Sequence, residues 1–154
     1  MIAYVIRPAH REEYPVICAM LATESLPSED VTVDQIPQVY VAVSDVDDGL
    51  LGSVAFAQYG ADALLRSLAV TPGARRNGIG IALVNKAQRE AADRAVRRLF
   101  LLTTTATTFF SAMGYRVVER GAAPGSLQAT SQFASLCPAS AVCMMKELSG
   151  QPSQ

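Results

Sequence analysis

The stretch VTPGARRNGIGIAL, from Val70 to Leu83, lies between an apolar run and an amphipathic segment, and this junction decides the fold. Before it, residues 63–70 are mostly apolar and predict a strand. After it, apolar residues recur every four positions, a spacing that predicts one buried face of a helix: Ile79, Leu83, Ala87 and Ala91. The chain is therefore expected to pass from a strand into a helix through a glycine-rich turn.

The same junction has the features of an anion site. The first amide hydrogens of a helix have no partner inside the helix, and its N-terminus carries a partial positive charge. Gly78 and Gly80 remove side chains from the path of a ligand, and Arg75 and Arg76 add positive charge beside those amides. The expected ligand is a pyrophosphate or a similar polyanion.

Two well-known phosphate motifs do not match this stretch. A P-loop requires a lysine after its second glycine, and Ile79 stands at that position. A dinucleotide fingerprint of the form G-x-G-x-x-G requires a third glycine, where this chain has Leu83. What remains is the pattern R-x-x-G-x-G, from Arg75 to Gly80.

The rest of the chain predicts strands, helices and two hairpin turns. The turns are expected at 45–49 and 59–61, where glycine follows or joins polar residues. Gly114 is expected to end a short helix that threonines cap and that carries Phe109, Phe110 and Met113. Further strands are predicted over 2–7, 39–43, 50–58, 98–102, 115–119 and 140–148, and further helices over 10–25, before Pro37 and over 124–136. This order predicts an α/β fold with a mixed sheet and helices on both of its faces.

Length and composition indicate one soluble domain, expected over 1–148, followed by a flexible tail over 149–154. No apolar run reaches the roughly 18 residues of a membrane span, and the first residues do not resemble a secretory signal, so we expect a cytoplasmic protein without a membrane partner. Residues 1–70 hold three basic and ten acidic side chains, whereas 71–120 hold nine basic and three acidic ones. Because aromatic residues are only 6% of the chain, a nucleic-acid partner is not expected, and a small phosphorylated ligand suits the basic region better.

The chain has three cysteines: Cys18, Cys137 and Cys143. The odd number and the absence of C-x-x-C spacing argue against a disulfide framework and a structural zinc site, so we expect no metal. The three cysteines are interpreted as small buried apolar residues. A site for trivalent arsenic at Cys137 and Cys143 is the alternative, because soft thiolates favour such ions.

The pattern from Arg75 to Gly80, directly after Leu68-Ala-Val70, resembles the signature loop of the GNAT superfamily of N-acetyltransferases. The resemblance extends from Ile2 to Leu148 and includes 103–115, which is similar to the family's helix that ends in a glycine and an aromatic residue. Residues 132–144 resemble one branch, the arsenic-resistance N-acetyltransferases. The resemblance implies a mostly antiparallel sheet of six to seven strands with a splayed central strand pair.

The family resemblance also implies acetyl-CoA as co-substrate, bound in a V-shaped opening between strands 63–70 and 98–103. The backbone at 68–70 is expected to pair with the pantetheine, and the amides at 76–81 to bind the pyrophosphate. The backbone amide of Leu68 is expected to be catalytic, because it would donate to the developing oxyanion. The residues expected to bind acetyl-CoA are Leu68, Ala69, Val70, Arg75, Arg76, Asn77, Gly78, Ile79, Gly80, Ile81, Thr103 and Phe110.

At two positions the chain departs from the family pattern. The tyrosine that commonly protonates the departing thiolate is replaced by Phe110, and a common asparagine is replaced by Thr103. Tyr115 matches the family's structural aromatic residue and is a weaker candidate for the acid. Cys143 or a water molecule are the alternatives, and so is a thiolate that leaves unassisted.

The acceptor site is expected beside Arg66. Alternation along strand 63–70 places Arg66 on the face of Leu68, where its guanidinium would grip a carboxylate, phosphinate or arsonate, unless it pairs with Asp62 or a neighbouring strand. Ser67 points to the opposite face, where it donates to a ligand or packs. Candidates for the base, with capping and turn roles as the alternative, are Glu24, Glu29 and Asp30, while His10 is expected to cap the first helix.

The leading hypothesis is an N-acetyltransferase that uses acetyl-CoA and acts on a small amine, such as an arsenic- or phosphinate-containing amino acid. The alternative is a binding protein on the same scaffold, a sensor of acetyl-CoA or of arsenicals with little turnover. Residues 124–136 and the last strand are candidates for a homodimer face or for a lid over the acceptor.

Overall fold

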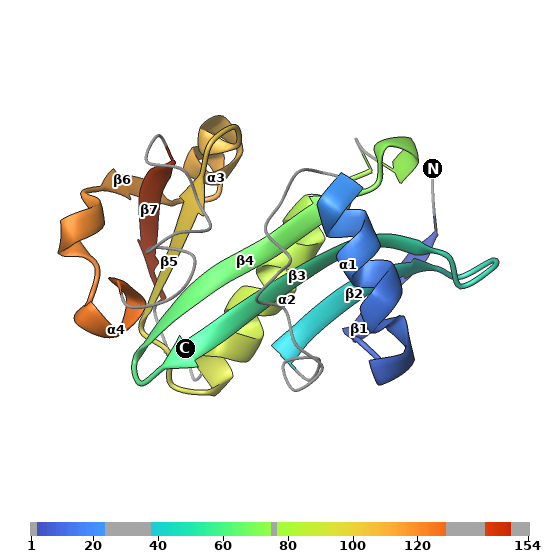
Figure 1. Ribbon diagram of the computed structural model, residues 1–154, viewed down its shortest axis with the longest axis horizontal. Coiled ribbons are helices and arrows are strands. Elements are labelled where there is room, and N and C mark those ends of the chain that lie inside the picture. Colours follow the sequence, from blue (N-terminus) through green and yellow to red (C-terminus); the bar gives the residue numbers. More distant parts are fainter. Residues whose placement is uncertain (1–2, 24–37, 75–76, 129–140, 149–154) are drawn as a thin grey trace. The chain divides into compact units, whose positions relative to one another are not determined.

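The structure, a computed structural model, describes residues 3–23, 38–74, 77–128 and 141–148 (Figure 1). One seven-stranded sheet has the hydrogen-bonded order β1-β2-β3-β4-β5-β7-β6. Its strands are β1 Tyr4–Pro8, β2 Val39–Ser44, β3 Leu50–Tyr59, β4 Asp62–Val70, β5 Arg98–Thr103, β6 Arg116–Val118 and β7 Val142–Glu147. The helices are α1 Tyr14–Thr23, α2 Ile79–Asp93, α3 Thr107–Ala112 and α4 Gly125–Gln128.

The sheet is mixed and mostly antiparallel, as expected. β1 with β2, β2 with β3, β5 with β7, and β6 with β7 are antiparallel, while β4 and β5 are parallel. The chain divides into two compact units, residues 1–56 with 67–87, and residues 57–66 with 88–154. Each unit is described by itself.

In the first unit, β2 is buried on both faces because a helix covers each of them. Val39, Val41 and Val43 share a core cluster with residues of α1. The residues that alternate with them, Tyr40 and Ala42, lie on the other face and are equally buried. In Figure 1 α1 crosses in front of β2 and β3, and α2 lies on the opposite side of the sheet. Lys86 Nζ of α2 lies 5.8 Å from the centre of the Tyr40 ring on β2. The prediction of helices on both faces is confirmed here.

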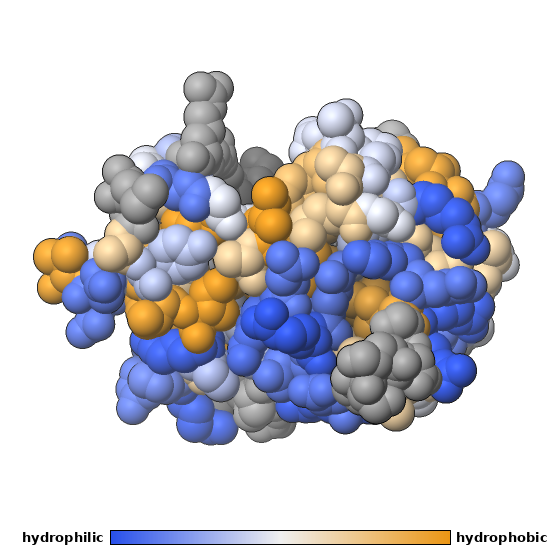
Figure 2. All heavy atoms as spheres, turned by 180° about the vertical axis from the view of Figure 1, so that it is seen from behind, coloured by the Kyte–Doolittle hydropathy of each residue, from blue (hydrophilic) through white to orange (hydrophobic). Residues whose placement is uncertain are grey.

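The buried face of α2 follows the predicted spacing, since Ile79, Leu83, Ala87 and Ala91 are all buried. Figure 2 shows the side of the protein that carries α2, where hydrophilic residues cover most of the outer surface of the helix. Ile81, in the first turn of α2, is an exception and is 49% exposed. On its inner side α2 comes very close to β3. A Cβ atom added to Gly52 would lie 3.0 Å from Leu83 Cδ1 and 2.7 Å from the Ala69 carbonyl oxygen. Glycine therefore sets how closely helix and strands approach each other.

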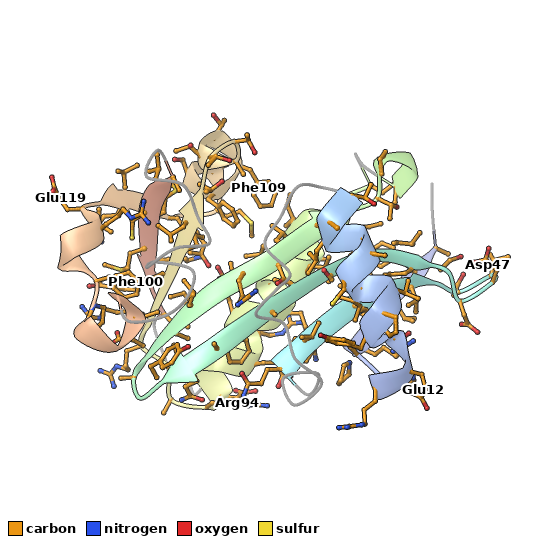
Figure 3. All side chains as sticks on the ribbon, viewed as in Figure 1. Glu12, Asp47, Arg94, Phe100, Phe109 and Glu119 are labelled. Carbon is orange, nitrogen blue, oxygen red and sulfur yellow. The ribbon has the colours of Figure 1, made fainter. Side chains whose placement is uncertain are left out.

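The second unit has its own core, built from β4, β5, β7 and α4: Leu64, Phe100, Ala123, Leu127, Cys143 and Met145. Figure 3 shows Phe100 extending from β5 on the side of α4. The parallel ladder joins Asp62–Leu64 to Arg98–Phe100. Its first rung is reinforced by Asp62 and Arg98, whose side chains form two hydrogen bonds of 2.7 and 3.2 Å.

The short helix α3 begins with a different cap from the predicted one, and it ends as predicted. Its N-cap is Ala106 rather than a threonine, and the hydroxyl of Thr103 accepts a hydrogen bond of 3.0 Å from the Ala106 amide. The threonine thus fixes the turn before the helix, while Ala106 itself makes no side-chain cap bond. At the other end Gly114 has a φ of +97°, which confirms the predicted left-handed residue.

Most of the other predicted elements are confirmed with small shifts of their ends. The first helix is preceded by a 3₁₀ turn over Arg11–Glu13, and the predicted hairpins hold Asp48 and Gly60 at positive φ. Of the helix predicted over 124–136, Gly125–Gln128 is helical and residues 129–136 lie outside the described part. The helical piece before Pro37 and the tail 149–154 also lie outside it.

Candidate functional site

The first unit contains a distortion in β4 at Ser67. Its φ is +60°, a left-handed conformation that a non-glycine residue adopts at a cost of roughly 1–2 kcal/mol. The Ser53 hydroxyl on β3 donates a hydrogen bond of 2.8 Å to the Ser67 carbonyl oxygen. Ser53 is 0% exposed, so the bond is formed away from solvent. A buried hydroxyl on one strand thus holds an irregular residue on its neighbour.

The residues beside Ser53 hold the end of β4. The Leu51 carbonyl accepts a hydrogen bond of 2.9 Å from the Thr71 amide. Gly52, the next residue, lies directly against the Ala69 carbonyl. Three consecutive residues of β3 therefore contact alternate residues of the end of β4: Leu51 and Ser53 through hydrogen bonds to Thr71 and Ser67, and Gly52 through its close approach to Ala69.

The predicted anion site lies at the start of α2 in the same unit. Gly78 has a φ of +74°, and, apart from its chain neighbours, no atom of the described residues would lie within 4 Å of a Cβ added there. Its carbonyl accepts from the Ala82 amide at 3.0 Å, which begins the helical bonding, and the Asn77 side chain donates to the Ala74 carbonyl at 3.0 Å. Gly80 lies in the first turn of α2. The backbone at Gly78 is thus free of side-chain cover among the described residues, while Arg75 and Arg76 lie outside them.

Regular alternation does not run through Ser67. The prediction for Arg66 and Ser67 assumed extended backbone along all of 63–70, and a φ of +60° interrupts it. The face of the strand on which Arg66 lies therefore does not follow from alternation. The structure shows that Arg66 is buried, with 9% of the residue exposed. The Asp62 carboxylate pairs with Arg98.

The second unit holds the candidates for the acid. Phe110 is buried and packs edge-to-face against Phe109 and Tyr115, with ring centroids 5.0 and 5.4 Å apart. The Tyr115 hydroxyl donates to Gln88 Oε1 at 2.9 Å, and burial raises the pKa of this phenol. Lys146 Nζ lies 5.8 Å from the centre of the Tyr115 ring. These contacts suit Tyr115 to a structural role, in agreement with its interpretation from the sequence.

Cys143 is part of the core of the second unit. It is 2% exposed, and desolvation by burial raises the pKa of its thiol. A raised pKa keeps sulfur protonated and lowers its affinity for soft metal ions. Cys137 lies outside the described residues, and within the described ones no group of three His, Cys, Asp or Glu side chains is arranged to hold a metal.

Of the N-terminal residues considered for the base or for helix capping, the structure describes only His10. His10 is the N-cap of the 3₁₀ turn, and its amide donates to Glu13 Oε1 at 2.7 Å, so its capping role is confirmed. Two hydrogen bonds from Arg7 also hold the Glu13 carboxylate, and they lower its pKa. Glu24, Glu29 and Asp30 lie outside the described residues.

Sequence reasoning did not find Ser53 and Gly52. Both lie in a strand that was predicted correctly, and neither stands near a motif. A glycine followed by a serine inside an otherwise apolar strand was the available signal, because glycine weakens a strand unless another backbone comes close.

Among the described residues, none of the helices has the length and the hydrophobicity that a membrane span requires.

Residues 35–117 match the family model of the acetyltransferase (GNAT) domain. Over 79 residues the chain is 38% identical to an uncharacterized N-acetyltransferase of Chlorobaculum tepidum. That match covers 51% of this chain and 50% of the relative, so the chain aligns with about half of the relative's length.

Solved structures show the same fold. The N-acetylglutamate synthase of Neisseria gonorrhoeae, in complex with coenzyme A and N-acetyl-glutamate, has a TM-score of 0.81 at 20% identity; the match covers 96% of this chain and 36% of the synthase. A Mycobacterium tuberculosis protein in complex with coenzyme A has a TM-score of 0.80 at 22% identity, over 94% of this chain and 99% of that one. The shared architecture extends over nearly all of this chain.

Proposed function

The chain belongs to the GNAT acetyltransferase domain family, whose model matches residues 35–117, and on this basis we propose that it transfers the acetyl group of acetyl-CoA to the amine of a small molecule. We take residues 1–148 as one catalytic domain. Different residues support the reaction type and the choice of acceptor.

The observation that carries the proposal is the junction of β4 and α2. Gly78 holds a left-handed backbone at the helix start, and a Cβ added there would meet nothing within 4 Å in the part of the chain that the structure describes. A phosphate can approach backbone amides only where no side chain intervenes. We assign the pyrophosphate to the amides from Arg76 to Ile81, including Asn77, Ile79 and Gly80, with charge from Arg75 and Arg76.

The proposed chemistry is direct transfer. The neutral amine attacks the thioester carbonyl, a C–N bond forms, and the C–S bond then breaks to release the thiolate of coenzyme A. We assign the Leu68 amide to the oxyanion of the tetrahedral intermediate, and the backbone from Leu68 through Ala69 to Val70 to the pantetheine. Such a donor typically contributes on the order of 10²–10³ in kcat.

No side chain is assigned to protonate the thiolate. The Tyr115 phenol is committed to Gln88, and the Cys143 thiol lies in the core. Phe110 has no proton to give, so we assign it, with Thr103, to the wall of the acetyl-CoA site. We propose that water takes the proton of the amine and returns one to the thiolate, with positioning supplying most of the rate.

For the acceptor we propose an amino acid with a second acidic group, and more narrowly an arsenic- or phosphinate-containing analogue. The narrower choice rests on the resemblance of residues 132–144 to arsenic-resistance N-acetyltransferases. Arg66 supports an acidic acceptor, because a guanidinium binds two oxygens of a carboxylate, phosphinate or arsonate at once. Ser67 is assigned as its neighbour in the acceptor site.

A second candidate function is a sensor that binds acetyl-CoA or an arsenical with little turnover. Phe110 favours it, since a buried phenylalanine stands where the family commonly has a tyrosine acid. The two candidates differ in whether coenzyme A is released.

The test is release of free thiol from acetyl-CoA, measured with a thiol reagent across a panel of amines. The panel contains L-glutamate, L-glutamine, an amino-acid phosphinate and an amino-acid arsenical. We expect thiol release only when an acceptor is present. Tight acetyl-CoA binding without release for any acceptor would favour the sensor, and absence of both binding and release would remove both candidates.

Arg66 variants test the acceptor separately. Arg66→Lys keeps the charge but loses the two-pronged geometry, and Arg66→Gln loses both. We expect KM for an acidic acceptor to rise in that order, while the Kd for acetyl-CoA stays unchanged. Equal KM values in all three proteins would remove Arg66 from the acceptor site.

A further inference from the structure

The bond between Ser53 and Ser67 has a consequence for the amide that follows it. The carbonyl of Ser67 and the N–H of Leu68 belong to one planar peptide group, in which a trans geometry points them in opposite directions. A donor that fixes the direction of the Ser67 oxygen therefore also fixes the direction of the Leu68 hydrogen. Ser53 Oγ is that donor, at 2.8 Å.

We propose that Ser53 is a positioning residue for acetyl transfer, because its buried hydroxyl orients the Ser67–Leu68 peptide and so aims the Leu68 N–H. This inference rests on the proposed function, in which that N–H stabilises the oxyanion. Ser53 itself touches neither the acetyl group nor the acceptor in this proposal. It acts only through the peptide that it holds.

The left-handed residue is the reason why such a donor is needed. Serine at a φ of +60° is strained, and the strained conformation persists only when its surroundings favour it over the extended one. The conformation of Ser67 therefore depends on contacts from its surroundings, and a hydrogen bond to its carbonyl oxygen is such a contact. The side chain of Ser53 provides this contact.

The neighbourhood of Ser53 makes the orientation precise. Ser53 lies opposite Val41 in the antiparallel ladder of β2 and β3, on the face that α1 covers. With an exposure of 0%, its hydroxyl has no access to competing water. Gly52, next in the chain, lies against the Ala69 carbonyl on the far side of Leu68, so both flanks of Leu68 are fixed from β3.

The test compares Ser53→Ala with Ser53→Thr. Alanine removes one oxygen and nothing else, so the hydroxyl bond is lost with little change in volume. Threonine keeps the hydroxyl and restores the bond. Ser44→Ala is the matched control, because Ser44 also bonds to the backbone through its hydroxyl, at the Val46 amide, but lies at the β2–β3 turn.

We expect kcat of Ser53→Ala to fall by about tenfold, a part of the loss typical for removing an oxyanion donor. The Kd for acetyl-CoA is expected to change by less than about threefold, because the phosphate amides are untouched. Ser53→Thr is expected to recover most of kcat, and Ser44→Ala to keep the wild-type value.

A second measurement follows the peptide itself. Backbone chemical shifts and the amide coupling constant of Ser67 distinguish a left-handed from an extended residue in solution. We expect them to report positive φ in the wild type and in Ser53→Thr, and to move toward the extended range in Ser53→Ala. This readout needs no turnover.

Two results would overturn the inference. One is a Ser53→Ala protein with wild-type kcat and unchanged Ser67 shifts. The other is a parallel loss of kcat, acetyl-CoA affinity and thermal stability, which would mark Ser53 as a structural residue only. If the wild type itself releases no thiol with any acceptor, the proposed function fails, and the control of the peptide by Ser53 is then decided by the Ser67 shifts alone.

Discussion

The phenol of Tyr115 donates a 2.9 Å hydrogen bond to Gln88 Oε1, and the tyrosine is only 3% exposed. Tyr115→Phe removes this donor and leaves the half-buried Gln88 acceptor with one partner fewer. We expect the free energy of unfolding to fall by about 1 kcal/mol, measured by urea denaturation, while kcat stays unchanged. Tyr59→Phe, at an exposed tyrosine, is the control and is expected to change neither quantity. A tenfold lower kcat in Tyr115→Phe at constant Kd for acetyl-CoA would instead make the phenol the catalytic acid.

The same tyrosine predicts a pH dependence. Burial raises the pKa of Tyr115 above its ordinary value of 10.0, so the phenol is neutral in the folded chain at a pH where it ionises in the unfolded chain. Unfolding then releases a proton, and the stabilising contribution, complete below about pH 10, is lost as pH rises, at up to about 1.4 kcal/mol per pH unit. The free energy difference between wild type and Tyr115→Phe is therefore expected to shrink from pH 9 to pH 11. A constant difference over that range contradicts the raised pKa.

Gly52→Ala is expected to be severely destabilising. The new methyl group would lie 2.7 Å from the Ala69 carbonyl oxygen, a backbone atom that cannot move without disturbing β4. Overpacking of this kind costs typically about 1–3 kcal/mol, and we expect the upper end of that range in urea denaturation. At Gly73 an added Cβ meets nothing within 4 Å, so Gly73→Ala is the control and is expected to stay within about 0.5 kcal/mol of wild type. Equal stability of the two variants would show that β4 yields to the methyl group.

Ala95→Gly is expected to stabilise the protein. Ala95 follows α2 with a φ of +69°, and the Val96 amide reaches back to the Ala91 carbonyl at 3.0 Å, which is the bonding of a helix end that favours glycine. Relief of the left-handed strain outweighs the greater freedom of glycine in the unfolded chain, for a net gain of about 0.5–1 kcal/mol. Ala92→Gly, three residues before Ala95 and still within α2, makes the same chemical change and is expected to lose up to about 1 kcal/mol. Thermal denaturation of both variants gives the sign.

Gly78→Asn is expected to weaken acetyl-CoA binding at least tenfold and to leave the fold intact. Asparagine tolerates the left-handed backbone, and its side chain would occupy the open space in front of the Gly78 backbone. Gly60→Asn is the matched control, since Gly60 also has a positive φ, +69°, with nothing within 4 Å of an added Cβ, but lies in the β3–β4 hairpin. Calorimetric titration with acetyl-CoA measures both. Equal affinities would move the pyrophosphate away from this junction.

Much of the fold could be predicted because its signals are local. The spacing of apolar residues four positions apart predicted the buried face of α2, and the glycines that follow or join polar residues predicted the hairpin turns. The cap of α3 was predicted less well, since any of several neighbouring threonines has the chemistry for it. The structure uses Thr103 in the turn and Ala106 as the cap. A run of identical residues does not tell which of them lies at a helix end.

The sequence predicts site residues only where their signal is contiguous. The glycines and arginines between β4 and α2 stand together in the chain, and this pattern predicts an anion site. The conformation of Ser67 depends on a hydroxyl fourteen positions earlier, on another strand. A prediction from the alternation of side chains considers one strand at a time. Nothing in the sequence of residues 63–70 indicates that a contact from β3 accompanies a distortion of β4. The faces assigned to Arg66 and Ser67 depended on that reasoning.

The position of β7 has a consequence for how the protein is made. β7 lies between β5 and β6 and pairs with both, although it is the last strand along the chain. During synthesis β5 and β6 leave the ribosome before Val142–Glu147, and among the described strands β6 pairs only with β7. An exposed, unpaired strand invites association with other chains. We therefore expect the nascent chain to be more prone to association before β7 emerges than after β7 has paired with β6.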